Sequence, residues 1–243
     1  MNIDSKLCVV MPAFNEESTI EEIINRVLNQ TIVSQLIVVD DCSTDSTATK
    51  LKQYESNNKV TVLYHDINKG KGAAIKSAQR FVTEGLTIIQ DADLEYNPAQ
   101  YSKLINPIVN GQADVVIGSR FQTSEERRVL YFWHYVGNKL LTLLSNAFTN
   151  LNLTDMECCY VVMKSEYFKS LDLFEKRFGN QPEMIAKLTA MKARFYEVSI
   201  SYFGRTYAEG KKIKARDGFR AIFCIVYYNS YWQRKKYSKS IAG

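Results

Sequence analysis

The first 95 residues repeat one pattern: an apolar run, a polar end and then, after the first three runs, a segment that can form a helix. The apolar runs cover residues 7–11, 35–39, 60–64 and 86–89. Between the first two, the residues spaced as on one face of a helix are Ile20, Ile23, Ile24, Val27 and Leu28. Buried strands that alternate with helices predict an α/β fold, with a mostly parallel sheet flanked by helices on both faces.

Polar residues follow each of the four predicted strands. In sheets of this kind, ligands bind beyond the carboxyl ends of the strands. The polar groups at these ends are Asn15 and Glu16, Asp40 and Asp41, the loop 68–72, and finally Asp91 and Asp93. The pattern therefore predicts one site that all four strand ends share.

Asp91 and Asp93 are separated by a single residue, Ala92. Positions two apart on extended backbone point to the same side, so the two carboxylates can converge. They would repel each other unless a cation lies between them. A hard divalent cation, whose shell phosphate oxygens complete, suits such a pair. A solvated acidic turn is the alternative for these residues taken alone, and the other three strand ends favour the metal site.

Two further strand ends allow two interpretations each. The loop Asn68-Lys69-Gly70-Lys71-Gly72 is suited to a tight turn, because glycine and asparagine accept positive φ angles. It could equally present N–H groups and ammonium charge to a phosphate at a helix N-terminus. Likewise, Asp40 and Asp41 either cap the turn or accept hydrogen bonds from a nucleobase or ribose.

Composition excludes several classes of function. The net charge of +5 over 243 residues is too small to indicate a nucleic-acid partner. Two histidines and five cysteines without metal-ligand spacing make a zinc site improbable and favour a reducing compartment. The sequence has no secretion signal pattern and no run of about 18 apolar residues. We therefore expect a cytoplasmic chain that is neither secreted nor membrane-spanning.

Four segments of the first half, taken together, resemble the family-2 glycosyltransferases. They are residues 12–17 (PAFNEE), 38–45 (VVDDCSTD), 68–74 (NKGKGAA) and 91–93 (DAD), in the order and rough spacing of that family. The resemblance implies an inverting enzyme of the GT-A fold that uses a nucleotide sugar and a divalent metal. Cys42 stands where the family usually has Gly or Ser.

The resemblance and the strand-end positions together assign residues to the donor. Asp91 and Asp93 would bind Mg²⁺ or Mn²⁺ on the diphosphate. The residues expected to bind the nucleotide sugar are Pro12, Ala13, Asn15, Glu16, Asp40, Asp41, Lys69, Gly70, Lys71, Asp91, Ala92, Asp93, Arg205 and Lys211.

The second half is similar to the polyprenyl-phosphate glycosyltransferases, which include dolichyl- and undecaprenyl-phosphate mannosyl- and glucosyltransferases. The similarity rests on segments 118–120 (GSR), 137–141, 153–164, 181–188 and 202–213, and it covers about residues 6–228. Ala215 stands where many relatives have Trp. The resemblance implies hexose transfer from a UDP- or GDP-sugar to a polyprenyl phosphate.

On this basis the acceptor phosphate would bind Arg120 and Arg127 or Arg128. Asp155 and Glu183 are each assigned as a base or an orienting group, and the sequence does not choose between these roles. The full set of predicted catalytic residues is Asp91, Asp93, Arg120, Asp155, Glu183 and Arg205.

Segment 129–152 is apolar almost all round a helix, with Trp133 and several tyrosines near its start. Such a helix either packs inside the protein or lies on a membrane. Periodicity alone favours core packing. A second hypothesis is attachment to the membrane surface through this segment, a last helix at about 216–233 and the basic residues 234–236.

We expect one GT-A domain over residues 1–234 and a short basic tail over 235–243. Its nucleotide-sugar half would cover about 6–120 and its acceptor half 121–234, and homo-oligomerisation is left open. Three alternatives remain: a family-2 enzyme that acts on a glycan hydroxyl, a sugar-phosphate nucleotidyltransferase, and a non-catalytic nucleotide-binding module.

Overall fold

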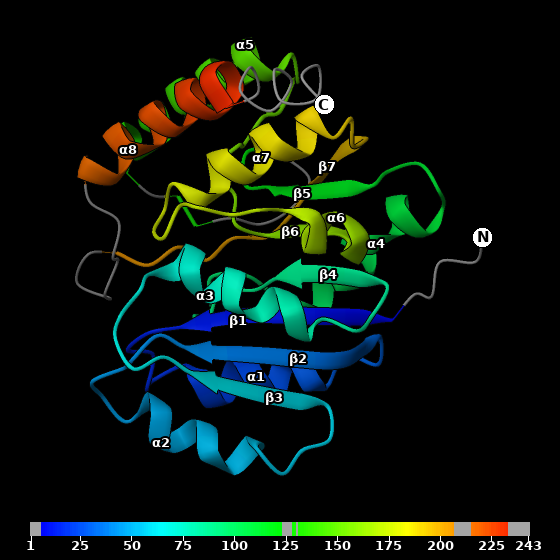
Figure 1. Ribbon diagram of the computed structural model, residues 1–243, viewed down its shortest axis with the longest axis vertical. Coiled ribbons are helices and arrows are strands. Elements are labelled where there is room, and N and C mark those ends of the chain that lie inside the picture. The colour runs from blue at the N-terminus through cyan, green and yellow to red at the C-terminus, as the bar shows by residue number, and fades with distance from the viewer. Residues whose placement is uncertain (1–5, 123–127, 130, 207–214, 233–243) are drawn as a thin grey trace, which may run out of the picture.

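The computed structural model describes residues 6–122, 128–129, 131–206 and 215–232, and its centre is a seven-stranded sheet (Figure 1). The strands are β1 (Leu7–Ala13), β2 (Val33–Asp40), β3 (Val60–Tyr64), β4 (Leu86–Ile89), β5 (Val115–Ser119), β6 (Val161–Lys164) and β7 (Phe195–Ser199). Their order is β3-β2-β1-β4-β6-β5-β7, and β6 alone runs antiparallel to its neighbours. The predicted mostly parallel sheet is confirmed.

Helices cover both faces of the sheet, with α3 in front and α1 behind in Figure 1. The helices are α1 (Ile20–Leu28), α2 (Thr47–Leu51), α3 (Lys71–Ala78), α4 (Tyr101–Val109), α5 (Phe132–Thr149), α6 (Ser165–Ser170), α7 (Asn180–Ala190) and α8 (Ala215–Val226). Short 3₁₀ turns cover Lys52–Tyr54, Gln79–Phe81 and Pro98–Gln100, and a π-helical turn at Tyr227–Trp232 follows α8. Of the predicted stripe on α1, Ile20, Ile23, Ile24 and Val27 are buried, and Leu28 is partly buried against the core.

The register of β1 explains where the sheet opens. β1 pairs with β2 as far as Ala13 and Asp40, but its pairing with β4 ends at Val10 and Ile89. Pro12, near the carboxyl end of β1, has no N–H to donate to a neighbouring strand. β1 and β4 therefore stop pairing before the end of β1, and the residues after β4 enter a loop beside it.

Segment 129–152 corrects one prediction. It forms a single helix, α5, whose buried residues are Thr142, Ser145 and Thr149. The reason is that this polar face serves the loop that follows: the Thr142 hydroxyl accepts from the Met156 N–H at 3.1 Å, and the Asn146 amide donates to the Leu153 carbonyl at 2.8 Å. Core packing therefore applies only to part of the helix, where Leu141 and Leu144 lie partly buried against the core.

Other large apolar residues of α5 face outward. Trp133 is 77% exposed and Phe132 is 67% exposed. α8 lies beside α5 (Figure 1) and carries further exposed apolar residues. We call this set the α5–α8 surface; it consists of Phe132, Trp133, Leu140, Leu143, Phe148, Phe219, Ile222, Phe223 and Val226. None of the helices in the described ranges is long and apolar enough to cross a bilayer.

Candidate functional site

A cavity of about 310 Å³ lies where the strand ends meet. Its lining combines residues at or after the ends of β1, β2, β3, β4, β5 and β7 with residues that precede β6 and α7. They are Pro12, Ala13, Phe14, Glu16, Asp41, Asn68, Gly70, Lys71, Asp91, Ala92, Asp93, Glu95, Tyr96, Arg120, Glu157, Cys159, Arg177, Phe178, Tyr202 and Arg205. The structure therefore brings most of the sequence-predicted donor residues to one place.

Asp91 and Asp93 both line the cavity, and each is paired with a cation. The Lys71 ammonium lies 2.5 Å from Asp91 Oδ1, and Arg205 Nη2 donates to Asp93 Oδ2 at 2.6 Å. Burial lowers the pKa of Lys71, but Asp91 more than reverses this effect, so the net pKa is raised. Burial, together with Asp91 and Glu95, raises the pKa of Asp93 to about 7, although Arg205 opposes the shift.

Arg205 ties three acidic residues together across the cavity. Besides Asp93, its guanidinium donates to both carboxylate oxygens of Glu16, at 3.1 and 3.3 Å. Its backbone N–H donates to Glu95 Oε1 at 2.7 Å. Because Glu16 follows β1 and Glu95 follows β4, this arginine links the loops on the two sides of the gap in the sheet.

Asp41 fixes the loop that precedes α3. Its carboxylate accepts from the backbone N–H groups of Lys69 at 2.8 Å and Gly70 at 2.6 Å. The His65 ring lies 2.7 Å from the same carboxylate through Nδ1 and 2.9 Å from the Ser77 hydroxyl through Nε2. These partly buried contacts connect Asp41, on the cavity wall, to Ser77 near the end of α3.

The loop 68–72 does not hold its N–H groups ready for a phosphate. The N–H groups of Gly72 and Ala73 donate to the Lys176 carbonyl, at 2.9 and 3.4 Å, and those of Lys69 and Gly70 are used by Asp41. A Cβ built on Gly72 would overlap the Glu175 carbonyl oxygen, and Gly70 has φ +93°. The glycines therefore allow close backbone packing, and only the Lys71 side chain brings positive charge to Asp91.

Two predicted donor residues lie in a supporting turn rather than on the cavity wall. The Asp40 carboxylate accepts from the N–H and the hydroxyl of Ser43, at 3.2 and 2.5 Å. The Asn15 side chain exchanges hydrogen bonds with Thr44. Asn15 and Cys42 have φ angles of 51° and 61°, so left-handed backbone shapes both strand ends. Lys69 is likewise absent from the lining, and Lys211 lies outside the described residues.

Arg120 lines the cavity and is held by Asp155. Arg120 Nε and Nη2 donate to the two oxygens of Asp155, both at 2.7 Å, and the Arg120 backbone N–H adds a third bond at 3.0 Å. The Asp155 side chain is 0% exposed. Asp155 therefore orients the arginine and does not itself reach the cavity.

Glu183 and Arg128 lie apart from the cavity lining. The Glu183 carboxylate accepts from the N–H groups of Phe174 and Glu175, both at 2.8 Å, and from the buried Lys187 ammonium at 2.5 Å. It therefore holds the segment before α7. Arg128 donates to the Gly204 carbonyl at 3.2 Å, and Arg127 lies outside the described residues.

Several cavity residues were missed by the sequence analysis, among them Glu95, Glu157 and Tyr202. Glu95 and Glu157 each stand two positions after an aspartate that was selected, Asp93 and Asp155, so continued alternation was a usable signal. Tyr202 donates from its hydroxyl to Glu95 Oε2 at 2.9 Å, and the Arg120 guanidinium lies 5.2 Å from its ring centre. Nothing in the local pattern indicated this tyrosine.

The residues present fit a divalent cation. Asp91 and Asp93 supply hard oxygen donors on one wall. Burial, followed by the charges of Asp91 and Glu95, raises the pKa of Asp93, and a bound cation would favour its ionised form. Within the described ranges, no group of three or more His, Cys, Asp or Glu residues is placed to hold a metal by itself. Most of the coordination shell would then come from water and a bound diphosphate.

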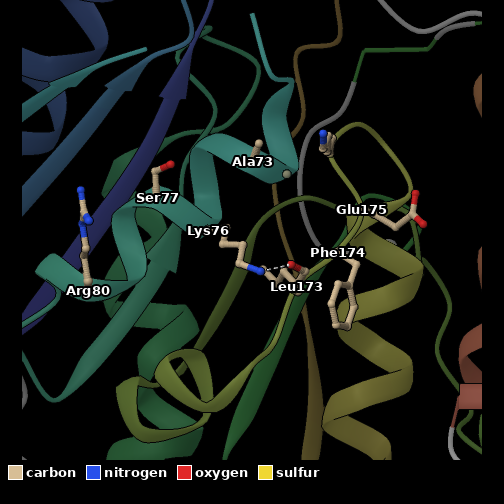
Figure 2. A pocket seen from close by; sticks show the side chains of 9 residues that line it. Ala73, Lys76, Ser77, Arg80, Leu173, Phe174 and Glu175 are labelled. Atoms are coloured by element: carbon tan, nitrogen blue, oxygen red, sulfur yellow. Dashed lines mark hydrogen bonds between the residues drawn. The ribbon is translucent and has the colours of Figure 1, made fainter. Parts of the chain in front are cut away.

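A second cavity of about 490 Å³ lies between α3 and the segment 173–176 (Figure 2). Lys76 crosses it and donates to the Leu173 carbonyl at 2.7 Å. Ser77, which bonds to His65, lies on its wall. The hydrogen bonds of Lys76 and Ser77 connect α3 to Leu173 and His65, and so hold in place the helix that begins with Lys71.

Comparisons with known proteins agree with this geometry. The model of the family described as glycosyl transferase family 2 matches residues 8–172. The UDP-N-acetylglucosamine–dolichyl-phosphate N-acetylglucosaminyltransferase of Methanococcus voltae is 26% identical over 242 residues, which cover 92% of this chain and 96% of that protein. The dolichol-phosphate mannosyltransferase of Pyrococcus furiosus is 34% identical over 118 residues, but these cover only 48% of this chain and 33% of that protein.

The fold is also found in a solved structure. Glucosyl-3-phosphoglycerate synthase from Mycobacterium tuberculosis, crystallised with Mn²⁺, UDP and glucosyl-3-phosphoglycerate, superposes with a TM-score of 0.71. The match covers 92% of this chain and 79% of that chain, at 19% sequence identity. At this identity the likeness establishes a shared fold.

Proposed function

Because this chain belongs to glycosyl transferase family 2, we propose that it transfers a hexose from a nucleoside diphosphate sugar to a polyprenyl phosphate, with inversion at the anomeric carbon. The observation that carries the proposal is the single cavity in which Asp91, Asp93, Lys71 and Arg120 meet. It combines a carboxylate pair with cations on both sides, which suits two phosphorylated substrates.

On the donor side, Pro12, Ala13 and Asp41 form the end of the cavity nearest β1 and β2 and would contact the nucleoside. Lys71 and Arg205 would turn from their carboxylates toward the diphosphate. Mg²⁺ or Mn²⁺ held by Asp91 and Asp93 would neutralise charge on the leaving diphosphate. The two relatives are named for dolichyl phosphate, and this supports the proposed acceptor class.

On the acceptor side, Arg120 would bind the lipid phosphate while Asp155 keeps its guanidinium in place. A phosphate monoester has a second pKa of about 6, so it is already a dianion near neutral pH and needs little help from a base. This agrees with the use of Asp155 as an orienting group. Arg127, Arg128 and Lys211 stay predicted contributors.

We also propose that the protein works on the surface of the membrane that holds its lipid acceptor, at the cytoplasmic face. The α5–α8 surface supports this, because aromatic and aliphatic side chains on two adjacent helices suit the boundary between headgroups and acyl chains. A second copy of this chain is the competing occupant, and the oligomeric state measured in detergent and in buffer separates the two.

The test is an assay of UDP- and GDP-hexoses with undecaprenyl phosphate in Mg²⁺ or Mn²⁺, with the product identified by mass. We expect a hexosyl-phosphate lipid and loss of turnover by about a hundredfold or more in Asp91→Asn. Full activity of Asp91→Asn would contradict the metal assignment, and absence of lipid product with every donor would contradict the acceptor. Transfer to an oligosaccharide hydroxyl in the same panel would support the alternative family-2 activity.

A further inference from the structure

Among the described residues, one carboxylate oxygen of the cavity residues has no hydrogen-bond partner. Glu157 Oε1 is buried and has no hydrogen-bond partner within the part of the chain that the structure describes. The other acidic residues on the wall are bonded: Glu16, Asp93 and Glu95 to Arg205, Asp41 to His65, and Asp91 to Lys71. A buried acceptor that stays unsatisfied destabilises the protein, so such an oxygen on a residue of the cavity wall indicates a ligand that donates to it.

The order of the strands shows which part of a ligand reaches Glu157. Along the sheet the order is β2-β1-β4-β6. The predicted nucleoside contacts follow β1 and β2, and the metal-binding pair, Asp91 and Asp93, follows β4. Glu157 precedes β6, and because β6 is antiparallel to β4, the start of β6 lies at this same edge of the sheet. Along the sheet, Glu157 therefore lies beyond the position expected for the diphosphate, on the side away from the nucleoside.

The surroundings of Glu157 agree with this position. Burial raises the pKa of its carboxyl to about 7; Arg120 and Lys71 oppose the shift, and Asp155 adds to it. Lys71 pairs with Asp91 at the expected diphosphate, and Arg120 lies at the expected acceptor phosphate. The group between these two phosphates is the transferred sugar, whose hydroxyl groups are hydrogen-bond donors.

We propose that Glu157 accepts a hydrogen bond from a hydroxyl group of the transferred hexose and thereby helps to select the donor sugar. The inference rests on the proposed function, because it needs a nucleotide sugar in the cavity. A polar group built to bind a substrate hydroxyl discriminates strongly against an analogue without it, because the protein group is then left unpaired.

The first experiment separates the sugar from the nucleotide. The affinities of UDP, GDP, UDP-hexoses and GDP-hexoses are measured by titration calorimetry at pH 8 with Mg²⁺, for the wild type, Glu157→Ala and Glu157→Gln. We expect unchanged nucleotide affinity in both variants and about tenfold or more weaker binding of the nucleotide sugar in Glu157→Ala, with Glu157→Gln intermediate. Glu22→Ala, on the exposed face of α1, is the matched control and should change neither affinity.

Unchanged nucleotide-sugar affinity in Glu157→Ala would overturn the inference while leaving the proposed function intact. Equal losses for nucleotide and nucleotide sugar would also overturn it, because Glu157 would then support the cavity as a whole. Wild-type protein that binds no nucleotide would contradict the proposed function itself and, with it, this inference.

A second experiment identifies the hydroxyl. Donors that lack one hydroxyl of the hexose are compared with the parent donor in the wild type and in Glu157→Ala. We expect one deoxy donor to bind the wild type about tenfold more weakly than the parent, and the variant to bind both equally. If every deoxy donor loses the same affinity in the variant as in the wild type, the hydroxyls bind elsewhere and the inference fails.

Discussion

The residues around the cavity and the apolar residues of α5 differ in where their partners lie. Around the cavity, Asp91, Asp93 and Arg120 have ion-pair partners within the chain. On the α5–α8 surface, side chains such as Trp133 face outward, while the buried side of α5 carries small polar groups such as Thr142. Substitutions in the first region should therefore change folding stability, and those on the second should change binding to something outside the chain.

The largest effect on stability is expected for Asp155→Asn. This change removes the buried carboxylate that pairs with Arg120 and so takes away a large part of the compensation for a buried guanidinium, which costs about 3–5 kcal/mol. Urea denaturation measures the loss of unfolding free energy. A double variant with Arg120→Met should recover part of it, because no charge is then stranded. A loss below about 1 kcal/mol for Asp155→Asn would show that water reaches the pair.

A matched pair of glycine substitutions tests the two regions side by side. Gly72→Ala places a Cβ against the Glu175 backbone and should destabilise the fold by about 1–3 kcal/mol, because backbone must move. A Cβ on Gly137 of α5 meets nothing within 4 Å, so Gly137→Ala should stabilise the helix by up to about 1 kcal/mol. Thermal unfolding of both variants measures these changes. If the two substitutions changed the stability equally, the predicted difference between the cavity region and α5 would be contradicted.

Substitutions on the α5–α8 surface should change membrane binding instead of folding stability. Phe132→Ser together with Trp133→Ser should weaken binding to vesicles of anionic lipid by about tenfold or more, since both rings would otherwise be buried in the interface. The unfolding free energy should stay within about 0.5 kcal/mol of the wild type.

Vesicle flotation measures this binding, and Val109→Ser, on the exposed end of α4, is the control that should bind like the wild type. Wild-type protein that does not float would contradict the membrane hypothesis. Equal flotation of the wild type and the double variant would place the contact on another surface.

The donor half was predictable because its signals are local. Apolar runs that end in Asp41 or Asp91 indicate both the strand and the site at its end, and topology brings these ends together. The roles within the loop 68–72 were not predictable in this way. Its glycines are needed because a distant segment, 175–176, packs against their backbone, and no short-range pattern records that contact.

The second half was harder to predict, for a related reason. Periodicity reports that a helix has an apolar side but not what covers it, so α5 was assigned to the core. In the sequence, Asp155 and Glu183 were both assigned as a base or an orienting group, and nothing distinguished their roles. Only the fold shows that Asp155 holds Arg120 and that Glu183 binds the backbone before α7. It also shows that Glu157 Oε1 has no hydrogen-bond partner among the described residues.

The prediction with the smallest expected effect concerns a second ion pair. It tests whether burial of the pair, rather than pairing itself, determines its contribution to the unfolding free energy. At the amino-terminal end of β5, Asp114 is bonded to Arg194 and Lys164, at 2.9 and 2.6 Å, in a pairing that resembles that of Asp155. The hydrogen-bonded Arg194 guanidinium, which is 53% exposed, holds the pKa of Asp114 well below its usual range.

Asp114→Asn should therefore cost only about 1 kcal/mol at pH 7, because water screens the pair. A carboxyl whose pKa is depressed in the folded state adds stability above its unfolded pKa of about 3.9, and this contribution is lost as the pH falls. Urea denaturation of the wild type and Asp114→Asn should thus give a difference that shrinks progressively below about pH 4. If Asp114→Asn lowered the unfolding free energy at pH 7 as much as Asp155→Asn, exposure of the arginine would not matter. The contrast between the ion pair at the cavity and the one at the start of β5 would then fail.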